Sequence, residues 1–254
     1  MRRRLLAIAW CPLALGLATF GLAAARAEEP QRWNVLFIAV DDLNTDLGCY
    51  GHPVVKTPNI DRLAARGVRF DRAYCQYPLC NPSRTSFLSG RRPDTTQIFN
   101  NGTPPRTSLG DVAFLPEQFR KAGYYTARVG KIAHGAFAQA VSWDLDENAA
   151  RPGPGAARPA ERKARAQAKA ARGERGGGVK LSWQATQRSD ADEPDGRTAR
   201  RIAQLLEEHR DGPFFLAAGF HKPHLAWVAP KKYFEMYPPD TIKLPPSLPE
   251  DRDD

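Results

Sequence analysis

Two long apolar runs constrain the fold of this chain more than any other feature of its sequence. Residues 34–40 (NVLFIAV) and 213–220 (PFFLAAGF) are almost continuously apolar and are bounded by polar residues. A strand that is apolar on both faces is typical of the interior of a parallel sheet, because helices cover such a sheet on both sides. The two runs therefore predict buried parallel strands.

The segments around these runs have the patterns of alternating helices and strands. Pro58 predicts the first turn of a helix that Thr57 caps and Gly67 ends. Residues 197–209 carry apolar side chains at the spacing of an amphipathic helix. The remaining predicted elements are a helix over 115–122 and strands over 68–74 and 124–129. This alternation predicts an α/β fold with a mainly parallel central sheet.

Functional residues of such a sheet are expected beyond the carboxyl ends of its strands. Asp41 and Asp42 follow the first apolar run, and His221 follows the second. Lys131 and His134 follow another strand-like segment, so both can reach the same edge. Taken alone, each of these residues is more often a solvated surface residue than a member of a site.

A cysteine at the start of a predicted helix is the most specific chemical feature. Residues 80–89 (CNPSRTSFLS) predict a short helix that Gly90 ends. Backbone N–H groups at a helix N-terminus favour an anion. Arg84 lies about one turn after Cys80, so both side chains can face the same space. The segment therefore predicts a small site for a negatively charged group.

This segment resembles the signature of the type I sulfatases, Cys-x-Pro-Ser-Arg followed by Leu-Ser-Gly. Further similar stretches are the two aspartates after the first strand, GCYG at 48–51, TPNIDRLA at 57–64 and Gly67. The resemblance extends over about residues 34–249, excluding the basic stretch at 151–178, and corresponds to the N-terminal half of the family. It implies an alkaline-phosphatase-like sulfatase fold and conversion of Cys80 to formylglycine, an aldehyde whose hydrate is the nucleophile.

Asp41 and Asp42 are the candidate metal ligands. Carboxylate oxygens suit a hard cation such as Ca²⁺ or Mg²⁺ better than zinc, although such residues alone are more often helix caps or solvated loop acids. The resemblance implies that both aspartates and residue 80 bind the metal, and it favours Ca²⁺ over Mg²⁺. The family's other metal ligands come from its C-terminal half, to which no segment of these 254 residues corresponds.

The resemblance also implies roles for the basic side chains. Arg84 would hydrogen-bond the formylglycine hydroxyls, and Lys131 would contact the sulfate. His221 would donate a proton to the leaving alcohol, and His134 would accept one as sulfate is expelled and the aldehyde re-forms. His224, in the sequence HKPH, would be structural or contact the substrate. A zinc pair is not expected, because no third ligand has a suitable spacing.

Within the sulfatases, five stretches resemble the iduronate-2-sulfatase branch: 90–96 (GRRPDTT), 129–131 (VGK), 220–224 (FHKPH), 230–233 (PKKY) and 237–238 (YP). The implied activity is hydrolysis of sulfate esters on a sulfated sugar or polysaccharide, such as a glycosaminoglycan. The implied partner is a maturation enzyme that generates formylglycine. Two other classes remain open: a phosphate or phosphonate ester hydrolase of the same superfamily, and an inactive, truncated carbohydrate-binding remnant.

The formal net charge of +9 arises outside the predicted core. The first 27 residues contain four arginines, and residues 151–178 contain eight basic and two acidic residues, so the remainder carries about −1. Nothing in that remainder indicates a nucleic-acid partner. Residues 151–178 lack large apolar side chains, and we expect a surface insertion or disordered loop there. A basic arm that attracts a polyanionic substrate is the alternative.

The N-terminus resembles a secretory signal over residues 1–27, with arginines, an apolar run and the cleavage pattern Ala-Arg-Ala. We expect export to the periplasm or the medium, a sulfatase portion over 28–254 and no stable membrane span. An N-terminal membrane anchor is the alternative. Cys49 and Cys75 would either pair with each other or stay reduced.

Overall fold

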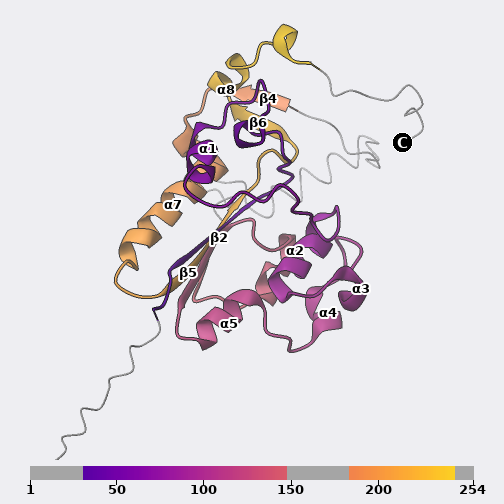
Figure 1. The fold of residues 1–254 in the computed structure, drawn as a ribbon. Coiled ribbons are helices and arrows are strands. Elements are labelled where there is room, and N and C mark those ends of the chain that lie inside the picture. Colours follow the sequence, from indigo (N-terminus) through magenta and orange to yellow (C-terminus); the bar gives the residue numbers. More distant parts are fainter. Residues whose placement is uncertain (1–30, 148–182, 244–254) are drawn as a thin grey trace, which may run out of the picture. The chain divides into compact units, whose positions relative to one another are not determined.

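The computed structural model describes residues 31–147 and 183–243 (Figure 1). The chain divides into two units, residues 1–32 and 33–254, and every helix and strand described belongs to the second. The predicted signal and the basic stretch at 151–178 lie outside the described residues. Within the described ranges, no helix is both long and apolar enough to cross a bilayer.

A four-stranded parallel sheet forms the centre of the fold. Its strand order is β1 (Val35–Val40), β5 (Phe214–Phe220), β2 (Tyr125–Gly130) and β3 (Leu145–Glu147). Phe220 pairs with Val40, and Gly219 pairs with Gly130. The carboxyl ends of β1, β5 and β2 therefore lie next to one another.

A second, small sheet pairs β4 (Trp183–Thr186) with β6 (Trp227–Pro230) in parallel. The α-helices described are α1 (Pro58–Ala64), α2 (Cys80–Ser89), α3 (Pro93–Thr96), α4 (Pro105–Leu109), α5 (Leu115–Lys121), α7 (Pro194–Glu208) and α8 (Lys231–Glu235). Short 3₁₀ helices are η1 (Gly48–Tyr50), η2 (Gly135–Ala140), η3 (Asp190–Asp192) and η4 (Pro239–Thr241).

Helices cover the two faces of the central sheet, with α7 on one side and α2, α4 and α5 on the other (Figure 1). Ile202 and Leu205 of α7 pack in one apolar cluster with Leu216 of β5. On the opposite face, Phe215 of β5 packs in a cluster with Leu88 of α2. Consecutive residues of β5 thus point to opposite cores, which explains why the strand is apolar throughout.

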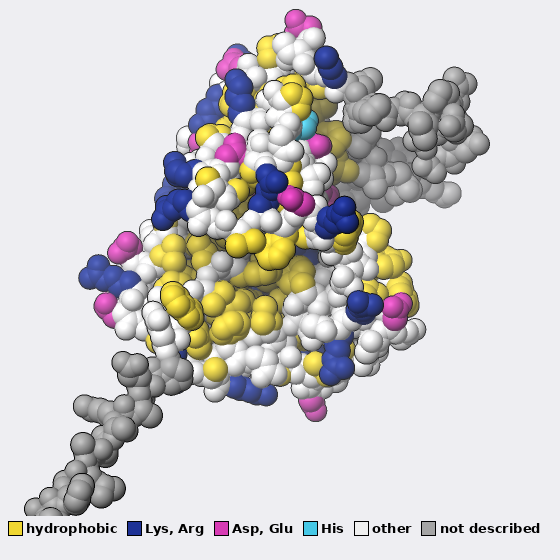
Figure 2. Space-filling view, viewed as in Figure 1, with side chains coloured by type: hydrophobic (Ala, Val, Ile, Leu, Met, Phe, Trp, Pro, Cys, Tyr) yellow, Lys and Arg dark blue, Asp and Glu magenta, His cyan; other side chains and the backbone are white. Residues whose placement is uncertain are grey.

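One face of β1 is not covered within the described residues. Leu36 and Ile38 are 41% and 48% exposed, because α7 packs on β5 and β2 rather than on β1. Figure 2 shows hydrophobic side chains gathered over this part of the surface. In the order of the described sheet, β1 is also an edge strand.

Most of the expected elements are confirmed. Strands occupy the two apolar runs and residues 125–130, and helices begin at Pro58, Cys80 and Leu115. The strand predicted over 68–74 is wrong: these residues form turns and irregular backbone. Val68 and Phe70 are 80% and 70% exposed. Among the described residues no strand pairs with this segment, and tertiary context overrides the β-forming propensity of its side chains.

Thr57 is the N-cap residue of α1, as predicted, but its side chain makes no capping hydrogen bond. Its hydroxyl accepts from the N–H of Gly48 at 2.8 Å and donates to the carboxylate of Asp61 at 2.8 Å. Thr57 therefore ties α1 to η1.

Candidate active site

Two strand ends fix the backbone of the candidate site. Beyond β1, the N–H of Asp41 donates to the carbonyl of Phe220 at 3.1 Å. Beyond β2, the N–H of Lys131 donates to the carbonyl of Gly219 at 2.9 Å. Gly130 has φ +85°, and a Cβ there would overlap the carbonyl oxygen of Gly219. The close approach of β2 and β5 thus requires glycine and brings Lys131 toward Asp41.

Helix α2 brings Cys80 to the same place. Its first N–H groups are partly used: the N–H of Asn81 donates to the side chain of Asn101 at 3.0 Å. The Asn81 side chain, 1% exposed, donates to the carbonyls of Asn100 and Thr103 at 3.0 and 2.9 Å. Gly90 ends the helix in the left-handed conformation, as predicted. The start of α2 is therefore anchored by a buried amide.

Arg84 faces the site, but it is buried and engaged with the protein. Its Nη2 lies 2.6 Å from Oδ1 of Asp41, and both side chains are 6% exposed. Its Nη1 donates to the carbonyls of Lys131 and Ile132 at 2.6 and 3.0 Å. Arg84 therefore positions the ends of β1 and β2 and supplies positive charge beneath the site.

Asp41 is the electrostatic centre of the cluster. One carboxylate oxygen is paired with Arg84, and the ammonium of Lys131 contacts the other. Burial alone would raise the pKa of Asp41, but hydrogen bonds and charges from Lys131 and Arg84 hold that pKa below its usual value. Lys131 Nζ also lies 3.7 Å from Sγ of Cys80, which is 4.0 Å from Oδ1 of Asp41.

The two histidines of HKPH lie in different surroundings. Nε2 of His224 is 4.0 Å from a carboxylate oxygen of Asp41 and 4.0 Å from one of Asp42. His221 instead has Nδ1 3.8 Å from Asp195 in the first turn of α7. Asp195 also accepts the backbone N–H groups of His221 and Lys222 at 2.9 Å each. Asp195 thus fixes the start of the loop that carries His224.

His221 and His134 share a cavity of about 180 Å³ with Lys131. Nδ1 of His134 is buried without a hydrogen-bond partner among the described residues. Burial, followed by the charges of Lys131 and Arg84, lowers the pKa of His134. Burial also lowers the pKa of His221, against the opposing charge of Asp195. Both imidazoles are therefore mainly neutral at pH 7.

The aspartates have the donor type that a hard divalent cation requires. Asp41 and Asp42 share a neighbour, Nε2 of His224, so their carboxylates face a common space. Asp42 adopts φ +59° and its side chain is 57% exposed. The ammonium of Lys131 contacts an oxygen of Asp41 that such a cation would use. The residues therefore fit a hard cation, with Lys131 as a competitor.

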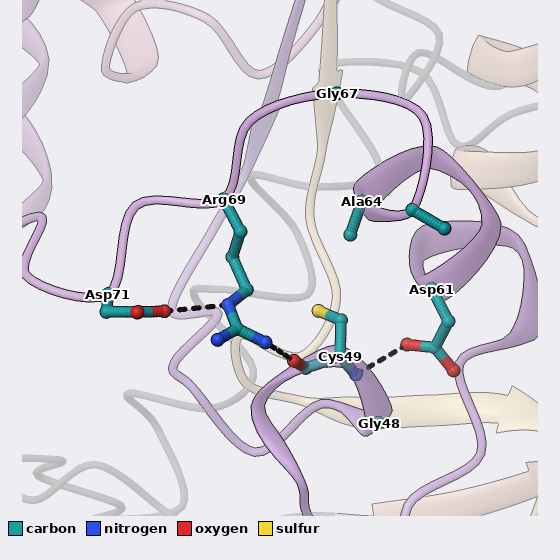
Figure 3. Close-up of a pocket in the computed structure, with 8 residues that line it drawn as sticks. Gly48, Cys49, Asp61, Ala64, Gly67, Arg69 and Asp71 are labelled. Carbon is teal, nitrogen blue, oxygen red and sulfur yellow. Dashed lines mark hydrogen bonds and ion pairs between the residues drawn. The ribbon is translucent and has the colours of Figure 1, made fainter.

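A larger hollow, of about 520 Å³, lies elsewhere, between η1, α1 and residues 67–71 (Figure 3). Arg69 joins Asp71, at 2.7 Å, to the carbonyl of Cys49. The N–H of Cys49 donates to Asp61 at 2.7 Å, and a Cβ on Gly48 would lie 2.5 Å from that carboxylate. The similar stretches at 48–51 and 57–64 thus serve to join η1 to α1.

Residues 33–250 match the Sulfatase family, and the chain belongs to that family. It is 35% identical to iduronate 2-sulfatase of Homo sapiens over 243 residues, which cover 91% of this chain and 44% of that protein. It is 36% identical to a sulfatase of Formosa agariphila over 239 residues, 89% of this chain and 46% of that protein. The chain thus spans less than half the length of these relatives.

A solved structure confirms the fold. The phosphonate monoester hydrolase of Agrobacterium radiobacter aligns with a TM-score of 0.61 at 23% identity, over 82% of this chain and 44% of that one. At this identity the likeness concerns the fold alone. The expected alkaline-phosphatase-like sulfatase fold, with a parallel sheet flanked by helices, is therefore confirmed.

The structure gathers most of the predicted site residues. Asp41, Cys80, Arg84 and Lys131 form one contacting cluster, Asp42 lies at its exposed side, and His134 and His221 line the adjoining cavity. His224, expected to be structural or to contact the substrate, lies at the cluster, and Asp195 behind the loop was not predicted. The HKPH sequence could have indicated His224, but the turn that separates its two histidines is set by the tertiary structure. No sequence feature indicated Asp195 except its position at the start of a helix.

Proposed function

We propose that this chain carries the nucleophile-bearing and sulfate-binding part of a hydrolase that removes sulfate from a sulfated sugar. The observation that carries the proposal is the contact of Cys80, at the start of α2, with the ammonium of Lys131 at 3.7 Å. The cysteine required by the family motif is therefore next to a cation that can bind an anionic substrate. Iduronate 2-sulfatase among the relatives supports a sulfated carbohydrate as the substrate.

The cluster divides the work between binding and positioning. When Cys80 is converted to formylglycine, its hydrate supplies the nucleophile, and a hard cation held by Asp41 and Asp42, with Ca²⁺ favoured over Mg²⁺, supplies further positive charge. Lys131 binds a sulfate oxygen and stabilises charge that develops there. Arg84 holds Asp41 in place, because its guanidinium is buried against that carboxylate.

Proton transfer is assigned to the histidines that line the cavity beside Lys131. His134, whose pKa is lowered, is mainly neutral and can accept a proton. His221 can donate a proton to the leaving oxygen when it is protonated. Burial lowers the pKa values of His134 and His221 below the usual 6.5. We therefore expect the rate to fall as pH rises through the lowered pKa of His221 and this residue loses its proton. His224 is the alternative proton donor to the leaving oxygen, since it lies beside the carboxylates of Asp41 and Asp42.

The test is hydrolysis of paired aryl sulfate and aryl phosphate by the chain expressed with a formylglycine-generating enzyme. Mass spectrometry of the peptide containing Cys80 should show loss of one sulfur and two hydrogens and gain of one oxygen. We expect preference for the sulfate ester, no activity in Cys80→Ala and normal activity in the matched variant Cys75→Ala.

Three results would change the proposal. Preference for the phosphate ester would favour the phosphate and phosphonate hydrolases. A thiol that stays unconverted at Cys80, together with carbohydrate binding, would favour a non-catalytic remnant. Loss of activity in His224→Gln, with activity kept in His221→Gln, would transfer the proton-donor role to His224.

Export of the protein is also a proposal. It is supported by the signal-like sequence over residues 1–27. N-terminal sequencing of the secreted or periplasmic protein should begin at Glu28. Retention of the first 27 residues on a membrane-bound product would favour the anchor.

A further inference from the structure

Ligand atoms of three different types converge at the carboxyl edge of the sheet. A carboxylate oxygen of Asp41, Sγ of Cys80 and a ring nitrogen of His224 all lie within 4.8 Å of one another. They come from the end of β1, the start of α2 and the loop between β5 and β6. The contacts among them are long, since Asp41 lies 4.0 Å from both Cys80 and His224.

The imidazole of His224 is oriented as a metal ligand. Its Nδ1 lies 2.6 Å from the carbonyl oxygen of Leu225. Since a carbonyl oxygen can only accept, Nδ1 carries the proton, and in the neutral ring Nε2 holds the lone pair. Nε2 faces carboxylate oxygens of Asp41 and Asp42 at 4.0 Å. Metal-binding histidines have the same arrangement, with the second nitrogen donating to a carbonyl.

The combination of sulfur, nitrogen and oxygen ligands selects a different ion from the one that the carboxylates alone would bind. Thiolate and imidazole favour zinc and similar ions, whereas Ca²⁺ and Mg²⁺ require oxygen. We propose that the chain with unmodified Cys80 binds one zinc-type divalent ion through Asp41, Cys80 and His224. Water would complete the coordination, as in open zinc sites.

The outer contacts of this site are already in place. Arg84 holds the carboxylate of Asp41 at 2.6 Å, and Leu225 holds the ring of His224. Conversion of Cys80 to formylglycine would replace the sulfur ligand by oxygen, so the preferred ion would change from a zinc-type ion to a hard one. This change of ion rests on the proposed function, whereas binding by the unmodified chain does not.

Lys131 supplies a diagnostic competitor. Its ammonium contacts Asp41 and lies 3.7 Å from Sγ of Cys80. An ion in the site must displace this ammonium, and the two positive charges repel each other. The variant Lys131→Met should therefore bind the ion more tightly than the natural chain. A site elsewhere on the surface would not respond in this way.

The experiment is a titration of the full chain with Co²⁺ alone, after expression without a formylglycine-generating enzyme. We expect one equivalent of Co²⁺ to produce a thiolate-to-cobalt charge-transfer band, which Zn²⁺ then displaces. Cys80→Ser should lose the band, and the matched variants Cys49→Ser and Cys75→Ser should keep it. His224→Gln should weaken binding by at least the roughly 10–100-fold that loss of an outer contact costs.

A second measurement needs no variant: Zn²⁺ alone should protect Cys80, and not Cys75, from alkylation, as read by peptide mass spectrometry. The proposal is overturned by absence of the band, by its persistence in Cys80→Ser, or by equal alkylation of Cys80 with and without Zn²⁺. Weaker binding in Lys131→Met also contradicts it. None of these results depends on sulfate hydrolysis, so failure of the proposed function is recognised separately.

Discussion

Replacing Asp41 with asparagine tests the electrostatic structure of the site. Asp41 is 5% exposed and neutralises Arg84, whose side chain is 6% exposed, and Lys131, whose side chain is 12% exposed. Breaking a buried ion pair by removing one partner costs about 3–5 kcal/mol, because it leaves an uncompensated buried charge. Arg84 cannot reach solvent without leaving two backbone carbonyls, so we expect Asp41→Asn to fall within this range.

The matched control is Asp42→Asn. Asp42 follows in sequence, but its side chain is 57% exposed and lies 4.0 Å from the imidazole of His224. An exposed change of this kind costs at most about 0.5 kcal/mol. Urea unfolding of both variants in excess chelator excludes any contribution from bound cations. For a domain of this size, we expect Asp41→Asn to lower the melting temperature by roughly 6–20 °C.

A double-mutant cycle with Arg84→Met identifies the source of the loss. If the buried charge causes it, the double variant should be about 0.5–3 kcal/mol more stable than the sum of the single changes predicts. The reasoning is refuted if Asp41→Asn costs less than about 1 kcal/mol, or if it costs no more than Asp42→Asn. Additive single changes would show that Asp41 and Arg84 act independently.

Three further substitutions, two of them with a matched control, test the framework of the fold by urea unfolding. Gly130→Ala should destabilise the fold strongly, because its Cβ would overlap the backbone of β5. The control Gly90→Ala, at φ +67° with open space around it, should cost about 1–2 kcal/mol. Equal losses in the two variants would contradict the close approach of β2 and β5. Asn81→Ala should cost about 1–3 kcal/mol, since it removes two hydrogen bonds donated by a buried side chain, and a loss below about 0.5 kcal/mol would be inconsistent with the anchor. Burial raises the pKa of Glu117, but backbone N–H groups and an arginine lower it below 4.5 overall; its stabilisation is therefore complete above pH 4.5 and lost as pH falls through the lowered pKa. Glu117→Gln should remove this acid dependence, and Asp211→Asn, with a side chain 94% exposed, should retain it.

The regular elements could be predicted where local pattern and burial agree. The two apolar runs form β1 and β5, because apolar side chains on both faces of a strand need cover. Helix α2 ends at Gly90, because glycine enters the left-handed region without a steric penalty. Residues 68–74 have the same β-forming composition but no partner strand among the described residues. A single strand cannot satisfy its backbone hydrogen bonds, so composition there did not decide structure.

Most groups of the site could be named before the fold was known. The order of strands and of acidic or basic residues places Asp41 and Lys131 at one edge, since parallel strands end together. The pairing of these groups depends on the folded chain: Arg84 is buried against Asp41, and His224 rather than His221 faces the carboxylates of Asp41 and Asp42. Strand order follows from hydrophobic periodicity, whereas the direction of a side chain in a loop depends on contacts, such as those of Asp195, between residues distant in sequence.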